Sequence, residues 1–235
     1  MSGRRVWVTR AQPGADATAA RLRAMGFVPL VAPLLEVRAL PGGPIDLTGV
    51  AALAFTSANG VAAFAARWEE RRLPLFTVGR ATAGAARAAG FAAVTSADGD
   101  VAGLAMAIAA RAPFAGEVLH LRPAEPAGDL IGALARLGVP ARSLTIYETV
   151  ACPPDEGTVA QIQEFTAVLL HSPKASRVLA DRLACHPAPN LMALCFSEAV
   201  AAPLRAAGLA AIRVAAAPNE TGLLSLLNSP EASAR

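Results

Sequence analysis

Short apolar runs alternate along the chain with alanine-rich stretches in which polar residues recur at helical spacing. We expect four of the apolar runs to form buried strands: Val6–Thr9, Ala51–Phe55, Leu75–Val78 and Ala92–Val94. Glycine ends several alanine-rich stretches, and it adopts the left-handed C-cap conformation without a Cβ penalty. The expected C-cap glycines are Gly26, Gly90, Gly138 and Gly208. Alternation of strand and helix predicts a parallel sheet with helices on both faces.

The two halves of the chain resemble each other, so the strand and helix pattern forms an internal repeat. The stretch from Val6 to Val37 aligns with the stretch from Val118 to Thr149. The matched positions include Arg10 with Arg122, Gly26 with Gly138, Gly90 with Gly208, Ser57 with Ser172, and Gly103-Leu104 with Gly222-Leu223. The repeat predicts two α/β domains of similar construction.

Two proline-rich segments, at 33–44 and 147–154, predict extended connectors, because proline disfavours helix for itself and for its predecessor. Both segments lie inside a copy of the repeat rather than between the copies. We therefore expect the chain to cross once into a middle domain and to return. The expected division is a discontinuous first domain at 1–35 and 152–235, a second domain at 42–144, and connector strands at 36–41 and 145–151.

Composition limits the class of protein. Hydrophobic residues make up 54% of the chain and charged residues 17%, as in a folded globular protein. The longest apolar runs, such as Val101–Ala110, are far shorter than the ~20 residues of a membrane-spanning helix. The basic start at Met1–Arg5 runs directly into the first expected strand, without the apolar segment of a secretory signal. We therefore expect a soluble, cytoplasmic protein with no membrane partner.

Motifs for metals and organic cofactors are absent from the sequence. The three cysteines lack CxxC spacing and the three histidines are scattered, which predicts no disulfide framework and no metal. No G-x-G-x-x-G or P-loop follows a strand, so a nicotinamide-dependent Rossmann oxidoreductase is disfavoured and no cofactor is expected. Lysine and arginine are dispersed and aromatic residues are few, which disfavours nucleic acid as a partner. A small polyanion remains open as a ligand.

Polar residues follow several expected strands at points where a helix should begin. Ligands of open parallel sheets bind beyond the carboxyl ends of the strands, where helix N-termini present free N–H groups. The candidate binding residues are Arg10, Thr56, Ser57, Thr82, Arg122, Ser172, Lys174 and Ser197. Each serine is either a helix N-cap, which contributes about 1 kcal/mol, or part of a cleft for a ligand with many carboxylates. Lys174 is either a carboxylate contact or an ordinary solvent-exposed lysine.

Tyr147 is the only tyrosine of the chain, and its partner in the repeat is Leu35. One interpretation is a buried aromatic residue whose hydroxyl finds a hydrogen-bond partner. The other is a phenol at the mouth of a cleft between the domains, which donates a proton to a leaving hydroxyl. Its reference pKa near 10 keeps the phenol protonated at neutral pH, so it would act as a donor.

Six short motifs resemble those of the uroporphyrinogen-III synthase family and occur in that family's order, over essentially the whole chain. The motifs are Val8-Thr9-Arg10, Phe55-Thr56-Ser57-x-Asn59-Gly60, Val78-Gly79-x-x-Thr82-Ala83, Ile146-Tyr147-Glu148-Thr149, His171-Ser172-Pro173 and Ala217-Pro218-x-x-x-Gly222-Leu223-Leu224. The resemblance implies two flavodoxin-like or Rossmann-like parallel-sheet domains, joined by a two-stranded β connector. It also implies an active cleft between these domains.

The family's substrate is hydroxymethylbilane, an open chain of four pyrroles that carries eight carboxylates. The resemblance implies removal of water from the terminal hydroxymethyl group, inversion of the last pyrrole ring and closure of the macrocycle, without metal or cofactor. By similarity, Tyr147 would assist departure of the hydroxyl, and Ser57, Thr82 and Ser172 would bind the substrate. Many family members carry a glycine and a threonine where this chain has Ser197 and Val200, so Ser197 is the substitute candidate.

Two functions from different classes therefore stand side by side. The first is a uroporphyrinogen-III synthase, expected to be a monomer with a transient contact to hydroxymethylbilane synthase. The second is a non-catalytic two-domain binding protein for a small polycarboxylate. The product distinguishes them, because unaided hydroxymethylbilane closes to the uninverted isomer I, whereas the synthase forms isomer III.

Overall fold

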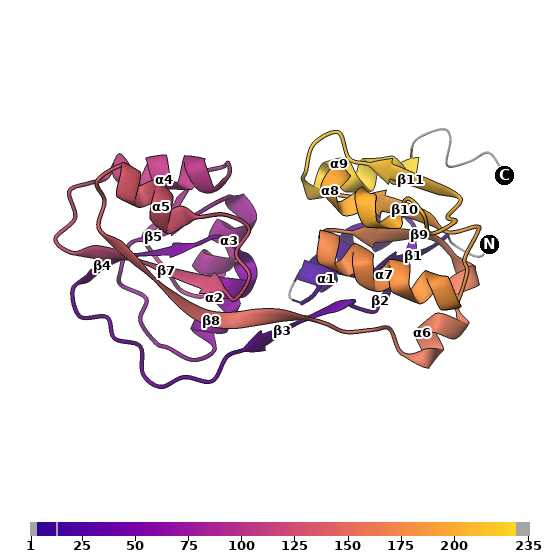
Figure 1. Ribbon diagram of the computed structural model, residues 1–235, viewed down its shortest axis with the longest axis horizontal. Coiled ribbons are helices and arrows are strands. Elements are labelled where there is room, and N and C mark those ends of the chain that lie inside the picture. The colour runs from indigo at the N-terminus through magenta and orange to yellow at the C-terminus, as the bar shows by residue number, and fades with distance from the viewer. Residues whose placement is uncertain (1–3, 13, 229–235) are drawn as a thin grey trace. The chain divides into compact units, whose positions relative to one another are not determined.

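The computed structural model describes residues 4–12 and 14–228, so the outer ends of the first predicted domain, 1–3 and 229–235, lie outside the described residues. The chain divides into two compact units (Figure 1). Unit 1 comprises Met1–Glu36 and Val150–Arg235, and unit 2 comprises Val37–Thr149. The chain enters unit 2 along β3 (Leu35–Ala39) and leaves it along β8 (Ala141–Ala151), which are neighbouring strands.

Unit 1 is built on a five-stranded parallel sheet of order β11-β10-β9-β1-β2. Its strands are β1 (Arg5–Val8), β2 (Val28–Val31), β9 (Phe165–Leu170), β10 (Met192–Cys195) and β11 (Ala211–Val214). Its α-helices are α1 (Gly14–Ala24), α6 (Glu156–Ala160), α7 (Pro173–Cys185), α8 (Glu198–Ala201) and α9 (Glu220–Ser225). Short 3-10 turns lie at Ile162–Glu164, Ala202–Leu204 and Leu226–Asn228.

Both faces of this sheet are buried, because successive strand side chains point to opposite sides. Trp7 and Val168 pack with Leu179 of α7 on one side. Val6 of β1 packs with Leu22 of α1 and with α9 on the other. The unit therefore has a helix layer on each face, as the alternation of strand and helix predicts.

Unit 2 carries a six-stranded sheet of order β3-β8-β7-β4-β5-β6, in which β8, β7, β4, β5 and β6 run parallel. Its remaining strands are β4 (Val50–Phe55), β5 (Leu75–Thr77), β6 (Val94–Ser96) and β7 (Glu117–Pro123). Its helices are α2 (Ala58–Ala65), α3 (Arg80–Ala88), α4 (Val101–Ala109) and α5 (Leu130–Arg136). The core divides again, with Phe64 of α2 and Ala86 of α3 on one face and Leu104 of α4 and Leu134 of α5 on the other.

The internal repeat is visible in the sheet orders. Repeat-mates β11, β10, β9, β1 and β2 of unit 1 correspond to β6, β5, β4, β7 and β8 of unit 2, in the same spatial sequence. Counted along the chain within each unit, and without β3 at the edge of the second sheet, the orders are 2-1-3-4-5 and 3-2-1-4-5. These are the flavodoxin-like and Rossmann-like arrangements. The structure thus confirms two parallel-sheet α/β units related by duplication.

All four predicted C-cap glycines have positive φ, at 83° for Gly26, 95° for Gly90, 71° for Gly138 and 64° for Gly208. The predicted strand at Ala92–Val94 was misplaced by two residues, since β6 spans Val94–Ser96. The reason is the cap itself: the Phe91 N–H still bonds the Ala86 carbonyl of α3, so the extended conformation begins later.

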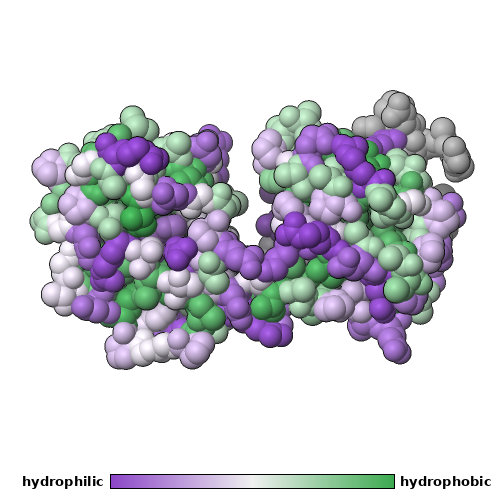
Figure 2. All heavy atoms as spheres, in the orientation of Figure 1, coloured by the Kyte–Doolittle hydropathy of each residue, from purple (hydrophilic) through white to green (hydrophobic). Residues whose placement is uncertain are grey.

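Among the described residues, the helices are too short or too polar to cross a bilayer. Figure 2 shows hydrophilic and hydrophobic residues interspersed on the visible face of each unit. The large hydrophobic side chains that are exposed are Met25, Val28, Met106 and Leu137. They belong to different elements of the two units, so the exposed apolar surface is scattered rather than gathered on one helix or strand.

Candidate active site

Each sheet contains one point at which the direction of strand addition reverses. In unit 1 this point lies between β1 and β9, and in unit 2 it lies between β4 and β7. Connections on the two sides of such a point leave in opposite directions, which opens a crevice at the carboxyl ends of the two strands. A residue that binds a ligand of either unit is therefore expected at the crevice of that unit.

In unit 2, Tyr147 and Ser57 meet at the crevice. Ser57 follows β4 and is the N-cap of α2, where its Oγ accepts a hydrogen bond from the Asn59 N–H at 3.2 Å. Tyr147 lies on β8 beside Pro123, the last residue of β7, and its hydroxyl forms a hydrogen bond with Ser57. The structure thus brings together two residues that are 90 positions apart in the sequence.

Gly60 makes this approach possible. A Cβ added at Gly60 would lie 3.2 Å from Tyr147 Cε1 and 3.2 Å from Phe55 Cδ1, so only glycine lets the ring rest on the first turn of α2 without displacement. The Tyr147 side chain is buried at 2% exposure. Burial raises the pKa of Tyr147 above 10, although the hydrogen bond with Ser57 opposes the rise. The phenol therefore keeps its proton at neutral pH and can donate a hydrogen bond.

The other candidates of unit 2 lie at the same edge of the sheet. Thr56 directly follows β4, and Thr82 is buried in the first turn of α3, which follows β5. Arg122 is the penultimate residue of β7. With Ser57 and Tyr147, the carboxyl edge of this sheet therefore carries four hydroxyl-bearing candidates and one arginine.

In unit 1, Arg10 belongs to a tight polar cluster. The Arg10 guanidinium pairs with the Glu220 carboxylate at 3.1 Å, Thr18 donates its hydroxyl proton to the same carboxylate at 2.5 Å, and His171 Nε2 lies 3.1 Å from it. Gly14 leaves the room for Arg10, since a Cβ there would lie 2.5 Å from the Arg10 Nε. The cluster occupies the carboxyl ends of β1 and β9, together with the start of α9.

The charge state of this cluster follows from its contacts. Burial alone would raise the pKa of Glu220, but hydrogen bonds from His171 and Thr18 and the charge of Arg10 bring this pKa down to about 2. Burial lowers the pKa of His171, against the opposing hydrogen bond to Glu220. At neutral pH the carboxylate is therefore ionised and the imidazole is neutral, so His171 donates its Nε2–H to Glu220.

The serines of unit 1 differ from each other. Ser172 is the N-cap of α7, and its Oγ accepts from the Ala175 N–H at 3.2 Å. Ser197 occupies the same position before α8, but its side chain makes no capping hydrogen bond. Lys174 lies in the first turn of α7. Both serines thus stand at helix starts beyond strand ends, and the Ser197 hydroxyl is not used by its own helix.

Sequence reasoning missed Glu220, Thr18 and His171 as members of the site. Glu220 lies just after the Asn219 N-cap of α9, at a position that the last motif leaves unspecified, and that helix start was the available signal. Charge alone could not identify it, because its partner Arg10 is 210 residues away.

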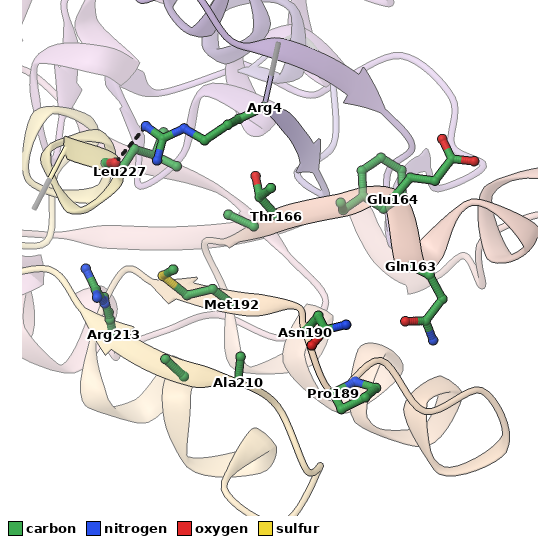
Figure 3. A pocket seen from close by; sticks show the side chains of 13 residues that line it. Arg4, Gln163, Glu164, Thr166, Pro189, Asn190, Met192, Ala210, Arg213 and Leu227 are labelled. Carbon is green, nitrogen blue, oxygen red and sulfur yellow. Dashed lines mark hydrogen bonds between the residues drawn. The ribbon is translucent and has the colours of Figure 1, made fainter. Parts of the chain in front are cut away.

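A cavity of about 620 Å³ lies in unit 1, at the edge of the sheet opposite to that unit's crevice. It is lined by residues at the amino ends of the strands, and Figure 3 shows Arg4, Thr166, Met192 and Arg213 around it. Arg4 donates a hydrogen bond to the Leu227 carbonyl at 3.2 Å.

Within residues 4–12 and 14–228, no three His, Cys, Asp or Glu side chains gather closely enough to hold a metal ion.

The two units have matched strand orders, and each carries hydroxyl and arginine side chains at the point where its strand order reverses. Parallel α/β sheets bind ligands at such points. The chain is therefore a duplicated α/β protein with a candidate ligand crevice in each unit. The family model described as uroporphyrinogen-III synthase HemD matches residues 16–225. The chain belongs to this family and is accordingly a hydro-lyase.

The fold itself is found in a solved structure. The uroporphyrinogen-III synthetase of Helicobacter pylori is 18% identical, covers 97% of this chain and 99% of its own, and superposes with a TM-score of 0.65. A mutant uroporphyrinogen III synthase from Thermus thermophilus is 19% identical, covers 96% of this chain and 97% of its own, and has a TM-score of 0.47. No curated protein sequence matches the chain.

Proposed function

We propose that the chain removes water from the terminal hydroxymethyl group of hydroxymethylbilane, inverts the last pyrrole ring and closes uroporphyrinogen III. Membership of the family supports the reaction. The observation that carries the assignment of chemistry to this chain's own residues is the Tyr147–Ser57 pair at the β4/β7 crevice. The non-catalytic binding protein is not favoured, because the family is one of enzymes.

In this proposal the Tyr147 phenol donates its proton to the departing hydroxyl. The C–O bond breaks, the oxygen leaves as water, and the pyrrole C–H replaced at ring closure returns one proton, so the reaction needs no external acid. A raised pKa keeps the phenol in its donor form. Ser57 orients the phenol through their hydrogen bond, and the rigid N-cap of α2 holds Ser57 in place.

The remaining candidates hold the substrate's carboxylates. We propose that Thr56, Thr82, Ser172, Ser197 and Lys174 contact them, together with the N–H groups at the helix starts. Arg10 contributes less than Arg122, because the carboxylate of Glu220 already compensates its charge. Monomeric state, cytoplasmic location and a transient contact with hydroxymethylbilane synthase complete the proposal.

The experiment is steady-state kinetics of Tyr147→Phe with freshly generated hydroxymethylbilane. We expect kcat to fall by about 10²-fold or more, as for loss of a general acid, while the thermal melting midpoint moves little. Thr166→Val is the matched control, since it also removes one hydroxyl but lies at the amino end of β9, where it bonds the Arg5 carbonyl. Equal turnover by wild type and Tyr147→Phe would remove the proposed acid role.

A further inference from the structure

Arg10 and Arg122 are repeat-mates, but their surroundings differ, above all in the carboxylate that pairs with Arg10. Arg10 is paired with Glu220 at 3.1 Å. The repeat that aligns Gly222-Leu223 with Gly103-Leu104 places Val101 at the position of Glu220. The helix starts are otherwise alike, because Asn219 caps the Gly222 N–H and Asp100 caps the Gly103 N–H. Unit 2 therefore has the arginine of the pair without the carboxylate.

A hollow of about 480 Å³ lies beside Arg122, within unit 2. Its lining includes His120 and Arg122 of β7, Ser143 of β8, and Gly128 and Asp129 of the following loop. Gly128 lies against Val101, since an added Cβ would be 2.9 Å from Val101 Cγ2. The residue that replaces the glutamate is therefore a neighbour of the hollow's wall.

Two polar groups of this hollow are buried without a protein partner. The Nε2 of His120, a side chain with 2% exposure, and the Nε of Arg122 form no hydrogen bond among the described residues. Burial, with the charge of Arg122 in addition, lowers the pKa of His120 to about 4, so its ring is neutral at pH 7. A buried polar group without a partner destabilises the fold, and an oxygen acceptor that both groups can reach relieves this cost.

The charges around the hollow favour a single carboxylate as that acceptor. His120 and Arg122 are two positions apart on one strand and point to the same face of the sheet. Asp129 also faces the hollow, but its carboxylate accepts from the Gly132 N–H at 2.9 Å at the start of α5. The guanidinium and the imidazole can thus hold a carboxylate between them, in the role that Glu220 plays toward Arg10.

We propose that the His120–Arg122 hollow binds one carboxylate arm of the tetrapyrrole substrate, in place of the internal carboxylate that unit 1 supplies. The inference rests on the proposed function and adds a subsite to it. This subsite lies on the face of the sheet opposite to Tyr147, because Tyr147 packs with α2 and the hollow lies on the side of α5. It therefore binds an arm and does not contact the reacting carbon.

Kinetics of two variants test the subsite. Val101→Glu supplies the missing internal carboxylate, and Arg122→Met removes the charge. We expect each to raise KM for hydroxymethylbilane about tenfold with kcat within about twofold, because an arm held equally throughout the reaction contributes to binding only. Arg136→Met, at an exposed position of α5, is the matched control and should leave both constants unchanged. Unchanged KM in both test variants would overturn the proposal.

A binding measurement separates this inference from the activity. The imidazole NMR signal of His120, assigned with His120→Gln, is followed while uroporphyrin III, the oxidised octacarboxylate form of the product, or acetate is added. We expect uroporphyrin III to shift the signal in wild type and in Arg136→Met, but not in Val101→Glu. If acetate shifts the signal and uroporphyrin III does not, the hollow binds free small anions only and the proposal is overturned. Formation of isomer I only, with the shift retained, would defeat the activity and leave the carboxylate site standing.

Discussion

Glu220→Gln removes the charge at the centre of the unit 1 cluster while preserving the shape of the side chain. Glu220 accepts hydrogen bonds from Thr18 and His171 and pairs with Arg10. Its pKa falls from an ordinary value of 4.5 to about 2. Since one pKa unit corresponds to about 1.4 kcal/mol, the cluster stabilises unit 1 by about 3 kcal/mol at most at pH 7. The Arg10 side chain is 35% exposed, so solvent screening reduces the expected loss to about 2 kcal/mol.

The pH dependence of this loss has a definite sign. A carboxyl whose pKa is lower in the folded state stabilises the fold above its unfolded pKa, near 4.5, and loses that contribution as the pH falls toward 2. The difference in unfolding free energy between wild type and Glu220→Gln should therefore be complete at pH 7. It should be still nearly complete at pH 5 and less than half as large by about pH 3.

Urea unfolding at several pH values measures this difference. Trp7 lies in the unit 1 core and Trp68 beside the unit 2 core, so a Trp68→Phe background makes the fluorescence report on unit 1 alone. Glu198→Gln is the matched control, because its ion pair with Arg205 is exposed at 71% and 62% and should contribute less than about 1 kcal/mol. A loss below about 0.5 kcal/mol at pH 7, or one that is equal at pH 7 and pH 3, would show that the charge of Glu220 does not stabilise unit 1 in this way.

Two glycine substitutions give further tests. Gly60→Ala places a Cβ 3.2 Å from the Tyr147 ring, so we expect kcat to fall about threefold to tenfold with a stability change below about 1 kcal/mol. Kinetics measures the first effect and urea unfolding the second. An unchanged kcat would contradict the role of Gly60 in positioning Tyr147. Gly222→Ala places a Cβ 2.6 Å from the Ala217 carbonyl oxygen and should destabilise unit 1 by about 1–3 kcal/mol. Gly84→Ala is the control, because a Cβ added at this helical glycine meets no atom within 4 Å. We expect it to stabilise unit 2 by about 0.5–1 kcal/mol. Equal effects at Gly84 and Gly222 would argue against a clash between the Gly222→Ala side chain and Ala217.

The fold was predictable to the extent that its determinants are local. Glycines at helix ends require positive φ wherever the chain folds, so Gly26 and Gly138 could be assigned from their position after an amphipathic stretch. The internal repeat predicted two α/β domains of similar construction, and the matched strand orders of the two sheets agree with this prediction. The boundary of β6 was wrong because the hydrogen bonds that cap α3 extend to Phe91, which apolar patterning does not reveal.

The candidate sites were predictable in their positions rather than in their partners. Ser57 and Tyr147 could each be singled out, but their hydrogen bond depends on the register between β7 and β8. The pairing of Arg10 with Glu220 could not be read, since it joins opposite ends of unit 1's sequence. His120 has no signal of its own, because a lone histidine in an apolar strand becomes informative only when its Nε2 is found without a partner.

In the proposed function, this chain directs ring closure with inversion of the last pyrrole. The most direct measurement is chromatographic separation of the uroporphyrinogen isomers formed when the wild-type protein is added to freshly generated hydroxymethylbilane. We expect isomer III to predominate, and the fraction of isomer I to rise when Tyr147→Phe slows the enzyme enough for unaided closure to compete. Predominance of isomer I with the wild-type protein, at the rate seen without protein, would contradict the proposed function.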